Sequence, residues 1–210
     1  MHVTYLFDPL CGWCYGASLA LEKLAGLDDL TIELAPTGLF AGEGARPMDE
    51  RFAAYAWQND QRIGRLTGQV FSQLYRDRVL GNIGSMFDSA PTTLGIVAVG
   101  LSKPDKEVEA LKVLQNARYV DGRNNSEMAV VADALDRAGF GDAASRVRSP
   151  DEPLLSAYRK RIEQGRRLMA EFQLDGVPAL LADQGDKRRS LSSGVLFGGF
   201  DLLAAKLQAA

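Results

Sequence analysis

Two cysteines separated by two residues are the strongest chemical signal in this sequence. Cys11 and Cys14 are the only cysteines among 210 residues, and they follow a short apolar run. Two thiols at this spacing on the first turn of a helix can close a small disulfide with little movement of the backbone. The first sulfur would lie near the unpaired N–H groups at the start of that helix, which favour a thiolate. The spacing therefore predicts a redox dithiol in which Cys11 attacks and Cys14 resolves the mixed disulfide.

Other interpretations of the cysteine pair stay open. The two residues could be buried structural cysteines, or half of a zinc site. The dithiol could also belong to a non-enzymatic module that binds a soft metal or a partner, but a tetrahedral site would then need a second chain. His2, the only histidine, is more typical of a strand residue than of a catalytic base. We therefore favour the redox interpretation and expect no metal and no bound cofactor.

Composition and charge exclude several classes of protein. Hydrophobic residues make up 46% and charged residues 24% of the chain, as in an ordinary globular protein. The net charge of −3 argues against a general affinity for nucleic acid or an anionic membrane surface. No apolar run approaches the roughly 18 residues that a membrane span needs. No charged region followed by an apolar one precedes Pro9, which favours a cytoplasmic protein, although a mature secreted chain would look the same.

The order of predicted elements surrounds the cysteines with a particular framework. Residues 2–7 are β-branched and aromatic and predict a strand, followed by a helix over 14–25 and a second strand over 30–35. From residue 37 to 175 only helical spacing recurs, in segments covering 52–74, 89–101, 104–114 and 124–135 and in a long helix that begins at 149–152 and ends near Gly176. A strand over 177–182, a partner strand over 189–192 and a helix over 200–207 end the chain. The predicted order is βαβ, many helices, then ββα.

Two short motifs make this chain resemble a known family. Asp8-Pro9 precedes Cys11-Gly12-Trp13-Cys14, and Gly176-Val177-Pro178-Ala179 opens the late strand. With the order of elements, they resemble the DsbA-like branch of the thioredoxin superfamily, and its FrnE-like, signal-less members in particular. The resemblance implies an α/β thioredoxin-like fold with a large all-helical insertion. We expect residues 1–36 and 176–210 to form the thioredoxin-like domain and residues 37–175 the insertion domain.

The resemblance also assigns roles to residues around the dithiol. The family's late proline is a cis residue that faces the dithiol, which the resemblance carries onto Pro178. An X–Pro bond makes the cis form cheap, and a cis bond here would present the backbone of Val177 to an extended peptide. A trans proline at the start of a strand is the alternative. We predict that Cys11, Cys14 and Pro178 are catalytic, and that Trp13, Val177 and Asp8 contact substrate.

Asp8 and the insertion aromatics each allow two interpretations. Asp8 could accept a proton from Cys14 or tune the thiolate, but Asp commonly bonds the backbone two residues on, and this turn role is favoured. Five insertion residues could line a substrate groove, although aromatics at helical spacing more often belong to the core: Trp57, Asn59, Phe71, Tyr75 and Phe87. We favour the core for them.

The leading hypothesis is a thiol–disulfide oxidoreductase, similar to protein disulfide isomerases and reductases. Its expected substrates are disulfides of proteins or small molecules, with glutathione as a candidate thiol co-substrate and a homodimer as a candidate assembly. The redox direction stays open, because strongly oxidising members of the family have His at the position of Trp13 and reducing thioredoxins have Pro. The alternative is an enzyme similar to kappa-type glutathione transferases or 2-hydroxychromene-2-carboxylate isomerases. Those enzymes usually carry Ser at the position of Cys11 and lack the second cysteine.

Overall fold

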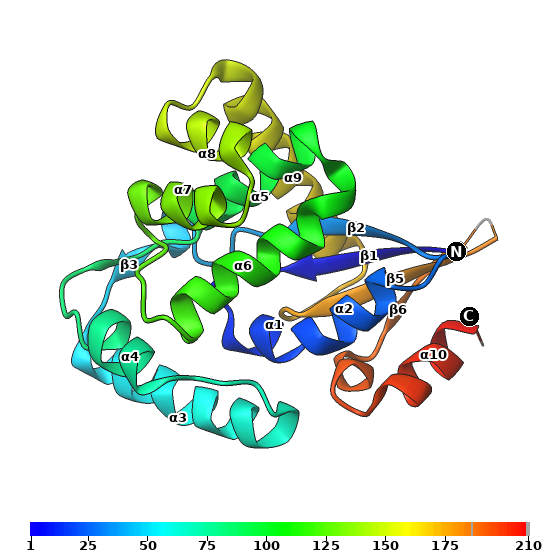
Figure 1. Cartoon of the computed structure of the whole chain (residues 1–210). Coiled ribbons are helices and arrows are strands. Elements are labelled where there is room, and N and C mark those ends of the chain that lie inside the picture. The colour runs from blue at the N-terminus through cyan, green and yellow to red at the C-terminus, as the bar shows by residue number, and fades with distance from the viewer. Residues whose placement is uncertain (186, 209–210) are drawn as a thin grey trace.

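One four-stranded sheet organises the fold (Figure 1). The computed structural model describes residues 1–185 and 187–208. β1 (His2–Phe7) runs parallel to β2 (Thr31–Pro36) and antiparallel to β5 (Ala179–Gln184), and β5 pairs antiparallel with β6 (Lys187–Leu191). The strand order is β2-β1-β5-β6, so β1 lies between the next strand along the chain and one from its far end. This arrangement confirms the predicted thioredoxin-like framework.

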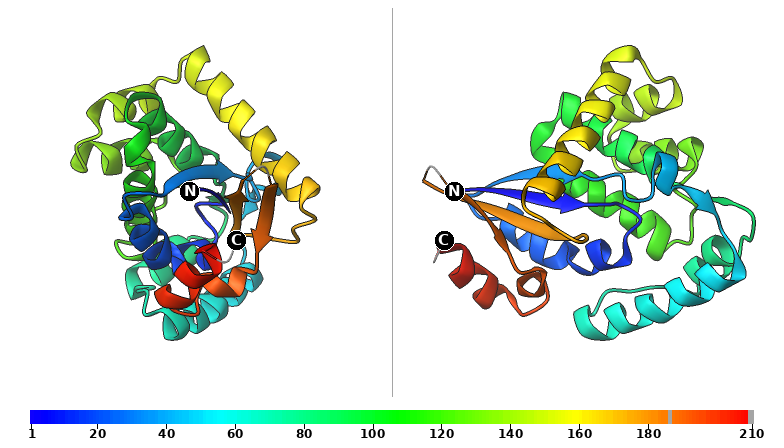
Figure 2. Two further views of the ribbon diagram at one scale, coloured as in Figure 1. Left: turned by 90° about the vertical axis from the view of Figure 1, so that its right-hand side faces the viewer. Right: turned by 180° about the vertical axis from the view of Figure 1, so that it is seen from behind.

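The strand β1 is buried on both faces, and its side chains alternate between two cores. Val3, Tyr5 and Phe7 belong to the largest cluster of buried side chains, whereas Leu6 packs with Leu168 of the helix α9 (Glu152–Glu171). Such an alternation is the two-residue period of an extended strand. Figure 2 shows α9 (yellow) on one side of the sheet and α2 (Ser18–Ala25, blue) on the other. The mostly apolar sequence of β1 is consistent with this coverage on both faces.

The first crossover is two short helices rather than the single helix predicted over 14–25. α1 (Gly12–Gly16) ends at Ala17, and α2 begins directly after it. The pieces have different neighbours, because α1 contacts α3 (Glu50–Thr67) and α2 contacts α6 (Glu107–Tyr119). Tertiary packing thus overrides a local pattern that reads as one helix.

The segment between the two halves of the sheet is almost entirely helical. Beside α3, α6 and α9 it contains α4 (Gln73–Tyr75), α5 (Ala90–Ser102), α7 (Met128–Arg137), α8 (Gly141–Arg148) and the short helical turns η1 (Gly42–Gly44), η2 (Arg76–Leu80) and η3 (Pro104–Lys106). It also contains a small antiparallel ribbon of β3 (Arg46–Pro47) and β4 (Met86–Phe87), so the expectation that it has only helices is wrong in this detail. After β6, η4 (Ser193–Leu196) and α10 (Phe200–Gln208) complete the described chain.

Two predicted helix boundaries were set by identifiable residues. The helical spacing over 52–74 is cut at Thr67, because Gly68 takes a left-handed conformation with φ of 77° and ends α3. α9 begins within the predicted start at 149–152, but Asp151 rather than Ser149 caps it, because the Asp151 carboxylate accepts a hydrogen bond from the N–H of Leu154 at 2.8 Å. The capping pattern at 124–127 is not used, because Glu127 makes no side-chain cap bond to α7.

The insertion and the sheet share one apolar core. Leu21 and Leu34 from the thioredoxin-like part lie in the same cluster as Leu94 and Leu111 from the insertion. The boundaries proposed at 36/37 and 175/176 stay a prediction.

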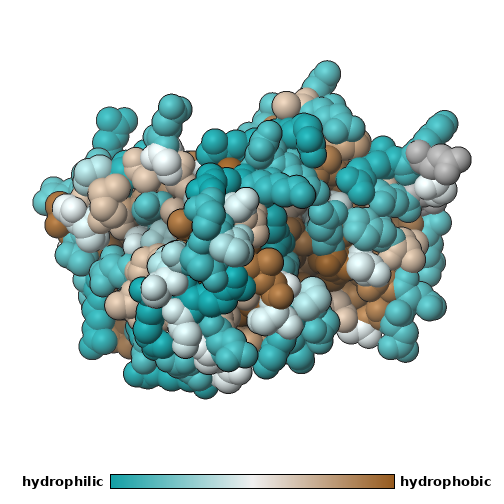
Figure 3. All heavy atoms as spheres, turned by 90° about the horizontal axis from the view of Figure 1, so that it is seen from above, coloured by the Kyte–Doolittle hydropathy of each residue, from teal (hydrophilic) through white to brown (hydrophobic). Residues whose placement is uncertain are grey.

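Hydrophilic residues cover most of the face shown in Figure 3, with hydrophobic residues visible in smaller patches between them. Among the described residues, no helix is both long and apolar enough to cross a membrane.

Most of the insertion aromatics are part of a second, smaller core. Tyr75 and Phe87 are buried there with Tyr119, and Trp57 and Phe71 pack against them from its edge. The interpretation as core residues is therefore confirmed for Tyr75 and Phe87, whereas Trp57 and Phe71 are half-buried at the edge of this core. Asn59, named with them, is outside it and donates a hydrogen bond to the Tyr55 carbonyl. This second core lies next to the cysteines, because Leu10 and Tyr15 belong to it as well.

Candidate active site

The two cysteines lie where the chain passes from β1 into α1. Cys11 is the residue that precedes the first turn of α1, with an extended backbone, and its carbonyl accepts the N–H of Tyr15 at 3.0 Å. Both cysteines are free thiols. The exposed fraction is 8% for Cys11 and 1% for Cys14, so the first thiol is the more exposed of two largely buried thiols. Such a geometry suits an attacking thiol followed by an enclosed resolving thiol.

The late proline segment forms a wall opposite Cys11. The peptide bond between Val177 and Pro178 is cis, as the resemblance implies. The thiol of Cys11 donates to the carbonyl oxygen of Val177, with 3.6 Å between sulfur and oxygen. The pairing of β5 with β1 brings these segments together, since Leu6 lies opposite Ala179. The structure thus joins Cys11, Val177 and Pro178 in one place.

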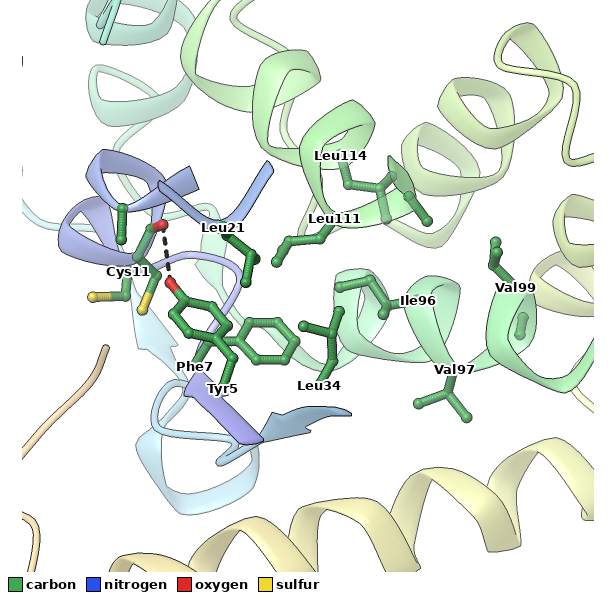
Figure 4. Packing of buried hydrophobic residues seen from close by; sticks show 14 of the residues in the cluster. Tyr5, Phe7, Cys11, Leu21, Leu34, Ile96, Val97, Val99, Leu111 and Leu114 are labelled. Carbon is green, nitrogen blue, oxygen red and sulfur yellow. Dashed lines mark hydrogen bonds between the residues drawn. The ribbon is translucent and has the colours of Figure 1, made fainter. Parts of the chain in front are cut away.

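The environment of Cys14 keeps it protonated. Burial raises the pKa of the Cys14 thiol well above its ordinary value, and the hydrogen bond and charge interaction with Cys11 raise it further. Figure 4 shows the hydroxyl of Tyr5 directed at the backbone oxygen of Cys14, to which it donates a hydrogen bond of 3.2 Å. A thiol with a raised pKa is mostly protonated and therefore reacts slowly with disulfides in solution. It can still attack a disulfide that is held next to it, which is what a resolving cysteine does after the mixed disulfide has formed on its neighbour.

Asp8 holds together the turn before the cysteines. Its carboxylate is fully buried and accepts three hydrogen bonds: from the N–H of Leu10 at 2.9 Å, the N–H of Phe40 at 3.1 Å and the hydroxyl of Ser89 at 2.7 Å. Burial raises the pKa of Asp8, and the three hydrogen bonds lower it. The bond to Leu10 is the expected turn contact. The other two tie this turn to the insertion, which sequence reasoning missed.

A groove of about 760 Å³ lies beside the cysteines. Trp13 and Phe197 form one side, with their rings in edge contact at 5.3 Å between centroids. Further residues that line it are those of 173–179 and 190–194. Trp13 and Val177, both predicted to contact substrate, therefore border the same hollow, whereas Asp8 is enclosed behind the cysteines and does not line it.

A buried carboxylate from the insertion is the main residue that sequence reasoning missed. Asp60 on α3 is 5% exposed, and its Oδ2 accepts a hydrogen bond of 2.9 Å from the hydroxyl of Tyr75. Burial raises the pKa of Asp60 to about 7, although the Tyr75 bond and the positive charge of Arg118 lower it. Asp60 lies three residues after Trp57 and three before Ile63, on the packed face of α3. A charged residue within an apolar stripe was the signal that could have found it.

The raised pKa of Asp60 predicts how stability changes with pH. The folded chain holds this proton up to about pH 7, but an ordinary Asp releases it near 3.8, so the folded state binds more protons in between. Wild-type stability should therefore fall as pH rises through this window, by about 4 kcal/mol at most. Asn does not ionise, so Asp60→Asn should remove most of this loss. Urea unfolding at about pH 4 and about pH 8 measures it, and equal pH dependence in both proteins would contradict the prediction.

Comparisons with known proteins identify the family of the chain. The family of DSBA-like thioredoxin domains matches residues 2–207. The cytosolic disulfide reductase DsbM from Pseudomonas aeruginosa is 30% identical, with a TM-score of 0.86 and 100% of both chains covered. The same protein solved with GSH gives 30% identity and a TM-score of 0.85, covering 100% of this chain and 98% of that one. None of the curated proteins compared with the chain matches it.

More distant structures share the fold. A 2-hydroxychromene-2-carboxylate isomerase is 20% identical with a TM-score of 0.61, covering 100% of this chain and 96% of that one. Reduced DsbA1 from Neisseria meningitidis is 16% identical with a TM-score of 0.52, covering 100% and 87%. The isomerase shows a common fold only, and the presence of both Cys11 and Cys14 argues against its chemistry here.

An accessible thiol at the start of a helix, an enclosed second thiol and a facing strand edge are the parts of a thiol–disulfide exchange site. The chain is a thiol–disulfide oxidoreductase. It belongs to the family of DSBA-like thioredoxin domains.

Proposed function

We propose that the chain reduces disulfides in the cytoplasm with glutathione as its thiol co-substrate. Its substrates would be disulfides of proteins or small molecules. Two comparisons support this direction: the 30% identical relative is a cytosolic disulfide reductase, and that relative was also solved with GSH. The domain division into residues 1–36 with 176–210 and residues 37–175 belongs to the same proposal, with the first part carrying the cysteines.

The contact between Cys11 and Val177 carries this proposal. The Cys11 sulfur lies 3.6 Å from the Val177 carbonyl oxygen, and Val177 also lines the groove. A peptide that pairs with the exposed backbone of Val177 would bring its own cysteine sulfur to Cys11. Glutathione is a short peptide with a central cysteine. The groove beside Val177 offers room for its two ends.

The exchange follows from the different surroundings of the two thiols. The Cys11 thiolate attacks one sulfur of the substrate disulfide, forms a mixed disulfide and expels the other substrate sulfur as a thiolate. Cys14 then attacks the Cys11 sulfur, and its proton ends on the second substrate thiolate as that leaves. The product is reduced substrate, as two thiols, and a Cys11–Cys14 disulfide.

Glutathione would restore the dithiol in two further steps. One glutathione thiolate attacks the Cys11 sulfur and frees Cys14, which takes up a proton. A second glutathione attacks the sulfur of the bound glutathione, which releases oxidised glutathione and returns Cys11 to its reduced form. Overall, one substrate disulfide becomes two thiols while two glutathione molecules become one disulfide.

A charge placed in the groove should weaken the use of glutathione selectively. Ser193 lines the groove and is exposed, and glutathione carries more negative than positive charge at neutral pH. We expect Ser193→Glu to raise the KM for glutathione about tenfold, the equivalent of about 1.4 kcal/mol, with little change in kcat. The assay is the reduction of hydroxyethyl disulfide, followed by the formation of oxidised glutathione.

Two controls separate groove binding from a general effect. Ser145→Glu adds the same charge at an exposed position of α8, outside the groove, and should behave as wild type. 3-Mercapto-1-propanol has a thiol but no peptide groups, and it is not the thiol that hydroxyethyl disulfide itself yields, so both proteins should use it equally well, with loss of hydroxyethyl disulfide as the readout. If the wild type shows no preference for glutathione over 3-mercapto-1-propanol, the proposed co-substrate is wrong.

A further inference from the structure

The insertion places a carboxylate directly against the dithiol motif. An added Cβ on Gly12 would lie 2.2 Å from Oδ1 of Asp60, which means that this oxygen fills the side-chain space that Gly12 leaves empty. Gly12 is the residue between Cys11 and Trp13 and the first of α1. A carboxylate oxygen therefore lies beside the N-terminal turn on which the accessible thiol is held. Asp60 is on α3, which belongs to the insertion rather than to the thioredoxin-like part.

The groups around Asp60 form a small buried network. Tyr75 donates its hydroxyl to Oδ2 at 2.9 Å. From α6, Arg118 is 1% exposed, and its Nε and Nη2 have no hydrogen-bond partner within residues 1–185 and 187–208. Tyr119, also from α6, donates to the Leu10 carbonyl at 2.8 Å and is close enough to both Asp60 and Cys11 for their charges to raise its pKa.

The Asp60 network is separate from Asp8 and places further charged and polar groups close to the cysteine turn. Facing Asp60 are Gly12 at the start of α1, which is the neighbour of Cys11, Tyr75 from α4, and Arg118 and Tyr119 from α6. Arg118 is held over the rings of Tyr75 and Tyr119 at 5.5 and 5.9 Å, and its only hydrogen bond within the described residues goes to Asn125. The positive charge of Arg118 lowers the pKa of Asp60 but does not outweigh the effect of burial, so an ionised Asp60 is only partly compensated.

We propose that Asp60 is a positioning residue that makes the reactivity of Cys11 depend on pH near neutrality. When Asp60 is ionised, its negative charge lies beside the same helix start that stabilises the Cys11 thiolate, and two anions there oppose each other. When Asp60 is protonated, this opposition disappears. The proposal rests on the assignment of Cys11 as the attacking thiol.

The physical basis is that burial moves the ionisation of Asp60 into the neutral pH range. Burial raises its pKa to about 7, so both forms are present at neutral pH. Because Asp60 changes its charge in this pH range, the reactivity of Cys11 beside it should change in the same range.

The pH profile of Cys11 alkylation tests this. The reduced protein is treated with iodoacetamide, and mass spectrometry of the peptides locates and times the label. Wild type should show an inflection near neutral pH that is missing from Asp60→Asn, which should react about three- to tenfold faster at about pH 7. Tyr75→Phe removes a bond that lowers the pKa of Asp60, and should move this inflection to higher pH. Asp77→Asn, an exposed carboxylate in the same insertion, should leave the profile unchanged.

A second measurement uses the unsubstituted protein. The carboxyl carbon of Asp60 is followed by NMR over the same pH range, before and after Cys11 is blocked with iodoacetamide. The blocked thiol carries no charge, so the titration midpoint of Asp60 should move to lower pH after blocking. This readout stands even if Asp60→Asn does not fold.

The possible failures are distinguishable. Label on Cys14 alone, or no label on Cys11, would contradict the assignment of Cys11 as the attacking thiol. Label on Cys11 with one inflection, the same in wild type and Asp60→Asn, would overturn the role of Asp60 and leave the exchange chemistry intact. An Asp60 midpoint that does not respond to blocking would overturn it as well.

Discussion

Replacing Cys14 with serine should turn this protein from a catalyst into a trap for its substrate. The variant keeps the accessible Cys11, so the first attack proceeds and a mixed disulfide forms at that residue. No thiol remains to resolve it, and the complex should accumulate at one substrate per chain. Cys11→Ser should instead lower turnover by about a thousandfold or more and form no adduct, because only the enclosed thiol is left. Mass spectrometry after incubation with a mixed aromatic disulfide measures both results.

The two substitutions are matched controls for each other, since each exchanges one cysteine for serine and the two positions are three residues apart at the start of α1. Unfolding curves should be recorded for both, because each sulfur is part of the core. If Cys11→Ser formed an adduct on Cys14 as fast as Cys14→Ser forms one on Cys11, the assignment of the attacking thiol to Cys11 would be contradicted. Disulfide reduction by both variants at the wild-type rate would place the chemistry elsewhere.

The parts of this site that the sequence predicted are those that depend on short-range spacing. Cys11 and Cys14 are three residues apart, between a strand and a helix, and local geometry alone limits what such a pair can do. Pro178 was found by its motif, and the pairing of β5 with β1 brings it opposite the cysteines. The βαβ and ββα halves could be predicted because strands and amphipathic helices have different periodicities of hydrophobic residues in the sequence.

The parts that were missed depend on contacts between distant segments. Asp60 is an acidic residue on an amphipathic helix, and only the packing of α1 against α3 shows that it faces Gly12. Arg118 would be expected at the surface, yet it is buried among aromatic rings. The interruption of the first helix at Ala17 has the same origin, since its two pieces pack on different helices. Local pattern cannot report a partner that lies elsewhere in the chain.

Asp8 also has a second structural role that the local sequence pattern does not indicate. The Asx-type contact to Leu10 was predicted from the sequence, but the bonds to Phe40 and Ser89 were not. Through them a single carboxylate joins the turn before Cys11 to two segments of the insertion. This explains how a helical insertion can hold the cysteine turn in place without contributing a strand to the sheet.

Asp8→Ala should therefore be among the most destabilising single substitutions in the protein. It leaves two backbone N–H groups and one hydroxyl without their acceptor in a site that is fully buried. An unsatisfied buried donor costs about 1 to 3 kcal/mol. The buried carboxylate itself carries a desolvation cost, which is the effect that raises its pKa. The substitution removes this cost, and the gain offsets part of the lost stability. We expect the free energy of unfolding to fall by about 3 to 5 kcal/mol in urea at neutral pH.

A graded set of variants tests whether those three bonds are the cause. Asp8→Asn keeps one acceptor oxygen but turns an amide toward a donor, so its loss should be smaller than that of Asp8→Ala. Ser89→Ala removes one donor together with its bond and should cost about 1 kcal/mol. Asp28→Ala, at an exposed position, should change stability by less than about 0.5 kcal/mol. If Asp8→Ala costs no more than Asp28→Ala, the carboxylate does not hold the cysteine turn to the insertion, and another contact must do so.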